Sequence, residues 1–203
     1  MKQKTIRNEI TIEGKGIHLG RDAKITIKPA DINTGYIFIR TDIEGHPIIR
    51  AIADNITNSE RSTIIAENGA SVSTVEHLLA ATYSLGIDNV IFEINNSEVP
   101  ILDGSSKNWL ELYKKTEIVE QNAERIVYDI KKTLKYTNEF GTEITVSPND
   151  YYSVTVDVDF NIPNFPSQTA TLDNINDFEK EISPSRTFVF LSHIPFSNYL
   201  LHL

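Results

Sequence analysis

Apolar and polar positions alternate over much of the first hundred residues, a pattern typical of β-strands. Residues 5–12 alternate around three isoleucines, and short runs rich in β-branched or aromatic residues follow. The expected strands are residues 5–12, 24–28, 36–40, 62–66 and 89–95.

Helical spacing first appears over residues 74–85, and again over residues 107–115. The stripe on the first helix predicts that one face packs on a sheet; it consists of Val75, Leu78, Leu79, Thr82 and Leu85. Ser73 with Glu76 fits a capping box, and Gly86 fits the end of the helix.

The polar stretch 117–124 is expected to be a linker, after which the order of elements begins again. We expect strands over 125–136, 142–147 and 152–160, then a short helix over 175–182. Strands followed by helices, twice over, predict an α+β fold of two domains, residues 1–120 and 121–203.

The amino-acid composition of the chain argues against several classes of function. The 203 residues carry 28 acidic and 19 basic side chains, a net charge of -9, which argues against nucleic acid and against a broad basic membrane-binding surface. Cysteine is absent, so any metal must be held by His, Asp or Glu. The first residues do not resemble a signal peptide and no stretch is long and apolar enough for a transmembrane segment, so we expect a cytoplasmic protein.

Glu76 and His77 are the candidate chemical groups, because at 100° per residue they point away from the apolar stripe. Their neighbours on that side are small: Ala80, Ala81 and Ser84. A histidine can bind a metal while the adjacent carboxylate takes a proton from water. A simpler interpretation is that Glu76 only caps the helix and His77 is structural. The pair does not decide between these interpretations, because zinc needs three protein ligands and one is visible.

Four segments together resemble one enzyme family, the zinc-dependent UDP-3-O-acyl-N-acetylglucosamine deacetylases of lipid A biosynthesis. They occur in the family's order, and they are Gly14-Lys-Gly-Ile-His-Leu-Gly20, Ser73-Thr-Val-Glu-His-Leu-Leu-Ala-Ala81, Glu98-Val-Pro-Ile-Leu-Asp-Gly-Ser-Ser106 and Ser185-Arg-Thr-Phe188. The resemblance runs from Thr5 to about Phe190 and implies two α+β domains, each a β-sheet carrying two helices, with the site between them.

The resemblance also implies hydrolysis of the 2-acetamido group of a UDP-linked acylated glucosamine, with release of acetate. His77 resembles a Zn²⁺ ligand, Glu76 the general base and Thr187 the residue that stabilises the oxyanion. Substrate-binding positions of the family correspond to Ile17, His18, Thr63 and Phe188. The alternatives are that Ile17 and Phe188 are core residues and that His18 braces a turn. Asp103 is expected to serve a turn, and Arg186 an ion pair.

The family's remaining zinc ligands, in a His-Lys-x-x-x-Asp motif, do not occur, and we expect them beyond residue 203. The second domain is therefore expected to be incomplete, and the 203 residues alone to bind zinc weakly and not to deacetylate. The alternatives are an inactive truncated remnant that at most binds a ligand, or part of a longer fusion with a hydroxyacyl dehydratase. Fe(II) is as compatible as zinc with such ligands. The sequence does not indicate the oligomeric state or the acyl-chain length.

Overall fold

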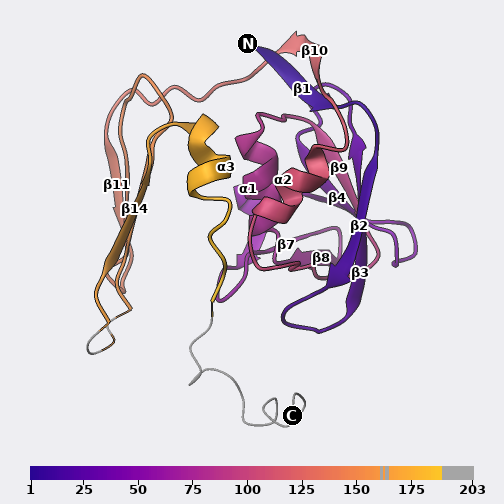
Figure 1. Cartoon of the computed structure of the whole chain (residues 1–203), viewed down its shortest axis with the longest axis horizontal. Helices are drawn as coiled ribbons and strands as arrows, with labels where there is room; N and C mark the ends of the chain where they lie inside the picture. Colours follow the sequence, from indigo (N-terminus) through magenta and orange to yellow (C-terminus); the bar gives the residue numbers. More distant parts are fainter. Residues whose placement is uncertain (161, 163–164, 189–203) are drawn as a thin grey trace.

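The computed structural model describes residues 1–160, 162 and 165–188, and confirms an α+β fold (Figure 1). Its largest element is a sheet of five strands, in the order β2 (Ile10–Lys15), β3 (Asp22–Pro29), β9 (Val90–Ile94), β4 (Tyr36–Arg40) and β5 (Ile48–Arg50). β4 runs parallel to β9, and the other neighbours are antiparallel. In β3, Ala23, Ile25 and Ile27 are buried at every second position, as the two-residue period of a strand requires.

A second, three-stranded sheet leads directly into the first helix. It consists of β6 (Ile56–Asn58), β7 (Ile64–Glu67) and β8 (Ala70–Ser73), preceded by the short 3-10 helix η1 (Ala53–Asn55). Asn68 and Gly69 join β7 to β8 with φ values of 52° and 75°, the two positive angles of the tight turn that suits a β-hairpin. The strand predicted over 62–66 begins two residues later than expected, at Ile64.

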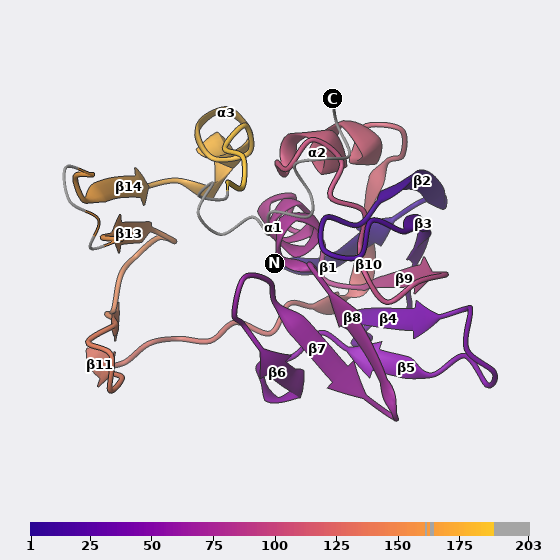
Figure 2. The same ribbon diagram turned by 90° about the horizontal axis from the view of Figure 1, so that it is seen from below.

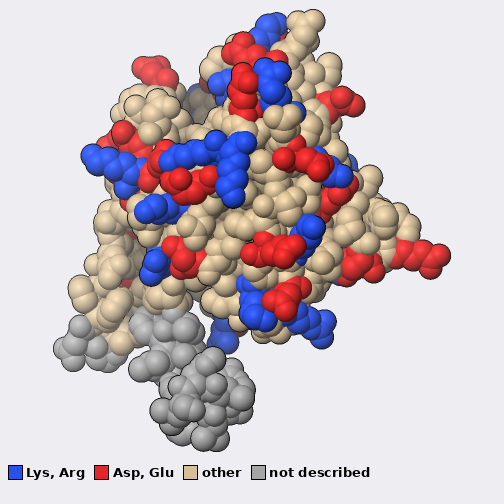
Figure 3. Space-filling view, turned by 45° about the vertical axis from the view of Figure 1, so that its right-hand side comes forward, with Lys and Arg blue, Asp and Glu red and all other residues tan. Residues whose placement is uncertain are grey.

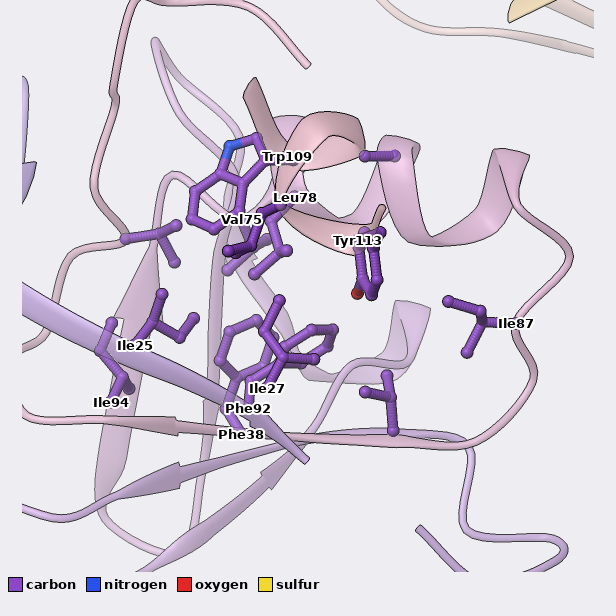
Figure 4. Close-up of a cluster of buried hydrophobic side chains, with 14 of the residues drawn as sticks. Ile25, Ile27, Phe38, Val75, Leu78, Ile87, Phe92, Ile94, Trp109 and Tyr113 are labelled. Carbon is purple, nitrogen blue, oxygen red and sulfur yellow. The ribbon is translucent and has the colours of Figure 1, made fainter. Parts of the chain in front are cut away.

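Two helices, α1 (Glu76–Ser84) and α2 (Lys107–Tyr113), cover one side of the five-stranded sheet (Figure 2). Leu78 and Trp109 pack above the rings of Phe38 and Phe92, whose centroids lie 4.7 Å apart (Figure 4). The predicted stripe of α1 is confirmed: Val75, Leu78 and Thr82 are buried, and Leu79 and Leu85 pack against the same core. Gly86 ends the helix with a φ of 68°, as predicted.

The predicted linker over 117–124 is wrong. Residues Ile118–Glu124 form β10, which pairs antiparallel with β1 (Lys2–Ile6). Side chains add to the backbone pairing, because Gln121 donates to the carbonyl of Ala30 and accepts a hydrogen bond from Asn89. The polar composition of β10 reflects its half-exposed position and not a lack of structure.

The strand predicted over 5–12 is also divided. β1 ends at Ile6 and β2 begins at Ile10, and the two belong to different sheets. The three residues between them are exposed or weakly buried, and Asn8 donates its backbone N–H to the Thr116 hydroxyl at the end of α2. The alternating pattern continued through the break because both strands bury isoleucines at the same period.

The remaining described residues form two hairpins and a short helix. β11 (Leu134–Thr137) pairs with β12 (Glu143–Val146), and β13 (Val154–Val158) pairs with β14 (Gln168–Leu172). The strand predicted over 125–136 thus starts only at Leu134. The helix predicted over 175–182 consists of the 3-10 turn η2 (Ile175–Asp177) followed by α3 (Phe178–Glu181). The hairpins leave apolar side chains exposed, among them Leu134, Tyr136 and Ile144.

Candidate active site

Glu76 and His77 lie in the first turn of α1, where both are half-buried. The predicted capping box is wrong: the N-cap position is Val75, and no side chain caps the helix. The chain instead turns sharply at Thr74, which has a φ of 60° between the end of β8 and the helix. The Glu76 carboxylate accepts a hydrogen bond from the backbone N–H of Thr63 at 3.2 Å. Two residues that sequence reasoning assigned to the site are thereby in contact.

The small residues predicted to lie beside Glu76 and His77 are only partly accessible. Ala80 and Ser84 are half-buried, but Ala81 is fully buried and belongs to the hydrophobic core. Ala81 therefore packs in the core and is not available to a ligand.

The loop before α2 connects α1 with the predicted residue Thr187. Ser106 donates its hydroxyl to the carbonyl of His77 at 3.0 Å, and Thr187 donates its backbone N–H to the carbonyl of Gly104 at 2.8 Å. Gly104 has a φ of 83°, and a Cβ there would lie 3.4 Å from Cγ2 of Thr187. Residues 103–106 thus bring Thr187, from the end of the described chain, near the first turn of α1.

Asp103 and Arg186 have the structural roles that were predicted for them. Asp103 accepts hydrogen bonds from the hydroxyl and the backbone N–H of Ser105, within its own turn. It also forms an ion pair with Arg186 at 3.2 Å. These contacts, the Ser105 hydroxyl foremost, lower the pKa of Asp103 and keep it ionised near neutrality. The pair fastens residues 185–187 to the loop that precedes α2.

Ile17, His18 and Phe188 are all exposed, so the alternative that Ile17 and Phe188 are core residues is wrong. Ile17 and His18 lie in the turn between β2 and β3, and Ile17 is 49% exposed. The ring of Phe188, 62% exposed, packs edge-on against Phe160 with centroids 5.4 Å apart. Exposed apolar side chains at such positions are available to contact a ligand.

Three residues near these groups were not predicted from the sequence to belong to the site: Thr74, Glu98 and Ser106. Glu98 accepts the backbone N–H groups of His18 and Leu19, each at 2.8 Å. Its motif was visible in the sequence, but a single glutamate in a mostly polar loop carries no sign of burial. Buried glutamate is rare, so its partners can be recognised only in three dimensions.

The described residues do not complete a metal site by themselves. Catalytic zinc is held by three protein ligands, and within residues 1–160, 162 and 165–188 no three His, Asp or Glu side chains gather closely enough to bind an ion. This part of the chain therefore offers the imidazole of His77, with the Glu76 carboxylate beside it. His193 and His202 lie outside the described residues.

Charges of both signs are mixed over the face shown in Figure 3, with lysine and arginine beside aspartate and glutamate. Ion pairs such as Lys28 with Glu93, at 2.8 Å, bring opposite charges together in the described chain. In the part of the chain that the structure describes, no helix is long and apolar enough to cross a membrane.

Comparison with known proteins identifies a family. A model of the UDP-3-O-acyl N-acetylglycosamine deacetylases matches residues 3–199. The bifunctional enzyme LpxC/FabZ of Bacteroides thetaiotaomicron is 42% identical over 195 residues, which are 96% of this chain and 42% of that protein. The UDP-3-O-acyl-N-acetylglucosamine deacetylases of Psychrobacter sp. and Chromohalobacter salexigens are 36% and 37% identical, and the chain covers 66% and 68% of their lengths. The chain thus spans about two fifths of the bifunctional relatives it matches and about two thirds of the others.

Proposed function

Because the chain belongs to the UDP-3-O-acyl N-acetylglycosamine deacetylase family, we propose that its protein hydrolyses the 2-acetamido group of UDP-3-O-(3-hydroxyacyl)-N-acetylglucosamine, releasing acetate in the cytoplasm. The observation that carries the proposal is the position of Glu76 and His77 side by side in the first turn of α1. Both side chains are half-buried, so they are partly shielded from water yet reachable by a substrate.

Glu76 is the proposed general base. Its carboxylate needs only to accept a proton from the attacking water and pass it on, and general acid–base catalysis of this kind contributes about 100- to 10,000-fold to a rate. The Thr63 N–H bond on one oxygen orients the carboxylate. The other oxygen has no hydrogen bond to the described residues, which leaves it available to a water molecule.

Zinc, with His77 as one ligand and the remaining ligands outside the described residues, would polarise the amide carbonyl and lower the pKa of water toward about 7. The Thr187 hydroxyl is the proposed donor to the oxyanion, since a hydroxyl directed at the developing charge lowers the barrier. Its attachment to Gly104 supports this role, because the same loop contacts His77 through Ser106.

Ile17, His18, Thr63 and Phe188 are the proposed substrate-binding residues. The exposure of Ile17 and Phe188 supports contact with an apolar acyl chain, because exposed apolar side chains gain free energy when a ligand covers them. We also propose the family's two-domain plan. The first domain would include β10, since that strand pairs with β1, so its boundary would follow Glu124 and not residue 120.

A Glu76→Gln substitution tests the base. In the whole gene product we expect kcat to fall about 100- to 10,000-fold, because glutamine keeps the shape and the Thr63 contact but cannot take a proton. The measurement is acetate release from the UDP-linked substrate, with the zinc content of both proteins determined in parallel. An unchanged kcat at equal zinc content would exclude Glu76 as the base.

A bifunctional protein is the second candidate, favoured by the names and the 39–42% identities of three relatives. The chain covers 42% of each of these relatives, so a second activity would reside in sequence outside these residues. Sequencing the gene beyond codon 203 distinguishes the possibilities. A downstream His-Lys-x-x-x-Asp motif followed by a further domain supports the fusion, whereas a stop codon supports the inactive remnant.

A further inference from the structure

Glu98 is the one carboxylate that the structure buries among the described residues, at 1% exposed. It follows β9 and forms no ion pair with any described residue. Burying a carboxylate without a cation is costly unless hydrogen bonds replace its water. Packing alone therefore does not explain why a glutamate is buried at this position.

Three neutral donors replace the water around the Glu98 carboxylate. The backbone N–H of His18 donates to Oε1 and that of Leu19 to Oε2, both at 2.8 Å. The hydroxyl of Thr74 lies 3.4 Å from Oε1. Hydrogen bonds to an ionised acceptor are about twice as strong as neutral ones, so Glu98 fastens the turn after β2 firmly.

The glycine at position 16 leaves the space that the Glu98 side chain occupies. A Cβ at Gly16 would lie 2.2 Å from Oε2 of Glu98 and 2.4 Å from Cδ. Gly16 does not have a positive φ, so the backbone itself would accept another residue. The three atoms nearest to such a Cβ all belong to the Glu98 side chain, which therefore excludes a side chain at this position.

The two segments that Glu98 joins both belong to the proposed site. The turn carries Ile17 and His18, and Thr74 stands two residues before Glu76. Thr74 adopts a left-handed conformation, rare for a β-branched residue, and its N–H bonds to the Thr63 carbonyl at 3.0 Å. The Glu98 contact helps to hold this strained residue at the start of α1.

We propose that Glu98 is a positioning residue: its carboxylate fixes the Ile17–His18 turn relative to the first turn of α1, so that substrate-binding and reacting groups form one site. This inference rests on the proposed deacetylase function. Glu98 itself is enclosed by the protein, and it acts through the backbone that it holds.

A Glu98→Gln substitution in the whole gene product tests the inference. Glutamine offers one acceptor oxygen and places an N–H group against the second backbone N–H, so one hydrogen bond is lost in a buried place. We expect amide exchange in residues 17–19 to accelerate about tenfold, and KM for the UDP-linked substrate to rise about tenfold, with kcat changing much less. Zinc content should stay the same.

The matched control is Glu67→Gln. Glu67 also accepts a backbone N–H, that of Arg50 at 2.9 Å, but it lies in β7 away from the turn. We expect this control to leave exchange in residues 17–19 and KM unchanged. Unchanged exchange or unchanged KM in Glu98→Gln would each overturn the positioning role.

Gly16→Ala approaches the same contact from the other side and covers the case in which Glu98→Gln fails to fold. The added methyl group should raise KM and the exchange rate in the wild-type background, and add little in a Glu98→Ala background, where the clash is absent. Additive effects would contradict the contact as the cause. Absence of turnover by the wild-type protein would refute the proposed function instead, and the exchange measurements would still judge whether Glu98 holds the turn.

Discussion

At the residue scale, Glu67 shows how a pKa shift reports an interaction. The guanidinium of Arg50 donates three hydrogen bonds to its carboxylate, the backbone N–H of Arg50 adds another, and Asn55 donates at 3.0 Å. These contacts, with the Arg50 side chain as the largest cause, lower the pKa of Glu67 from 4.5 to about 2. The cluster joins β5 to β7 and so fixes the small sheet that leads to α1.

A pH-dependent stability follows from that shift. The pKa in the folded state lies below the unfolded value of 4.5, so the stabilisation is present above 4.5 and is lost as the pH falls towards 2. We expect Glu67→Gln to lower the melting temperature at pH 7, and the difference from wild type to shrink between pH 4.5 and pH 2. Thermal melts across this range measure it. A difference that stayed constant down to pH 2 would contradict the pairing with Arg50.

Single residues were predictable where their chemistry is local. Glu76 and His77 could be selected from helical periodicity alone, although their roles stay predictions. The capping box failed because a motif of the right spacing does not reveal that Thr74 breaks the helix with a positive φ. Glu98 was missed because its donors lie about 80 residues earlier in the chain. Long-range backbone contacts leave no trace in the composition around a residue.

At the element scale, α1 and α2 are joined by a buried pair of hydroxyl groups. The hydroxyls of Thr82 and Tyr113 lie 2.6 Å apart, and Thr82 also donates to the carbonyl of Leu78. Burial raises the pKa of Tyr113 well above its usual range, so the phenol stays protonated under all ordinary conditions. The pair fixes the rotation of one helix against the other.

Removing both hydroxyls should cost less than the sum of the two separate losses. We expect Tyr113→Phe and Thr82→Val each to lower the free energy of unfolding by about 1 kcal/mol, since each leaves a buried hydroxyl or carbonyl with fewer partners. The double variant should lose less than the sum, because the interaction that both remove is counted once. Urea denaturation of the four proteins provides the cycle. Strict additivity would mean that the two hydroxyls do not interact.

Elements with strong periodicity were predicted best. The two helices and the strands around Ile25 and Phe38 appear where expected, because each buries one face in a regular pattern. β10 was predicted as a linker because its side chains are mostly polar. An edge strand can form from such residues, since backbone hydrogen bonds to a neighbouring strand hold it in place. Only the presence of β1 beside it makes this polar segment a strand.

At the scale of the whole molecule, a connection without regular structure joins β10 to β11. Residues 126–132 contain no helix or strand, and Ile126, Val127 and Tyr128 are between 63% and 92% exposed. Arg125, just before this connection, forms an ion pair with Asp88 at 2.7 Å. Beyond it, contacts return near α1, where the rings of Tyr83 and Tyr152 lie 5.5 Å apart.

Limited trypsin digestion should therefore cut first after Lys131 or Lys132. Both lysines are exposed in a stretch whose backbone can enter a protease without unfolding the core. We expect early fragments that end there, identified by mass spectrometry, with the portion before the cut resisting further digestion. A variant with both lysines changed to glutamine serves as control and should lose this early cut. Early cuts within β2 to β9 would contradict the expectation that the connection is the most accessible segment.

The pairing of β1 with β10 has a consequence for how the protein is made. Lys2 aligns with Glu124 and Ile6 with Ile118, so β1 is synthesised more than a hundred residues before its partner strand. At translation rates of about 5 to 20 residues per second, β1 waits roughly 6 to 24 s for that partner. During this time Ile6, fully buried in the finished fold, lacks its pairing partner Ile118. The two-stranded sheet of β1 and β10 therefore forms only after synthesis has passed residue 124, and until then β1 is a segment that a chaperone can protect.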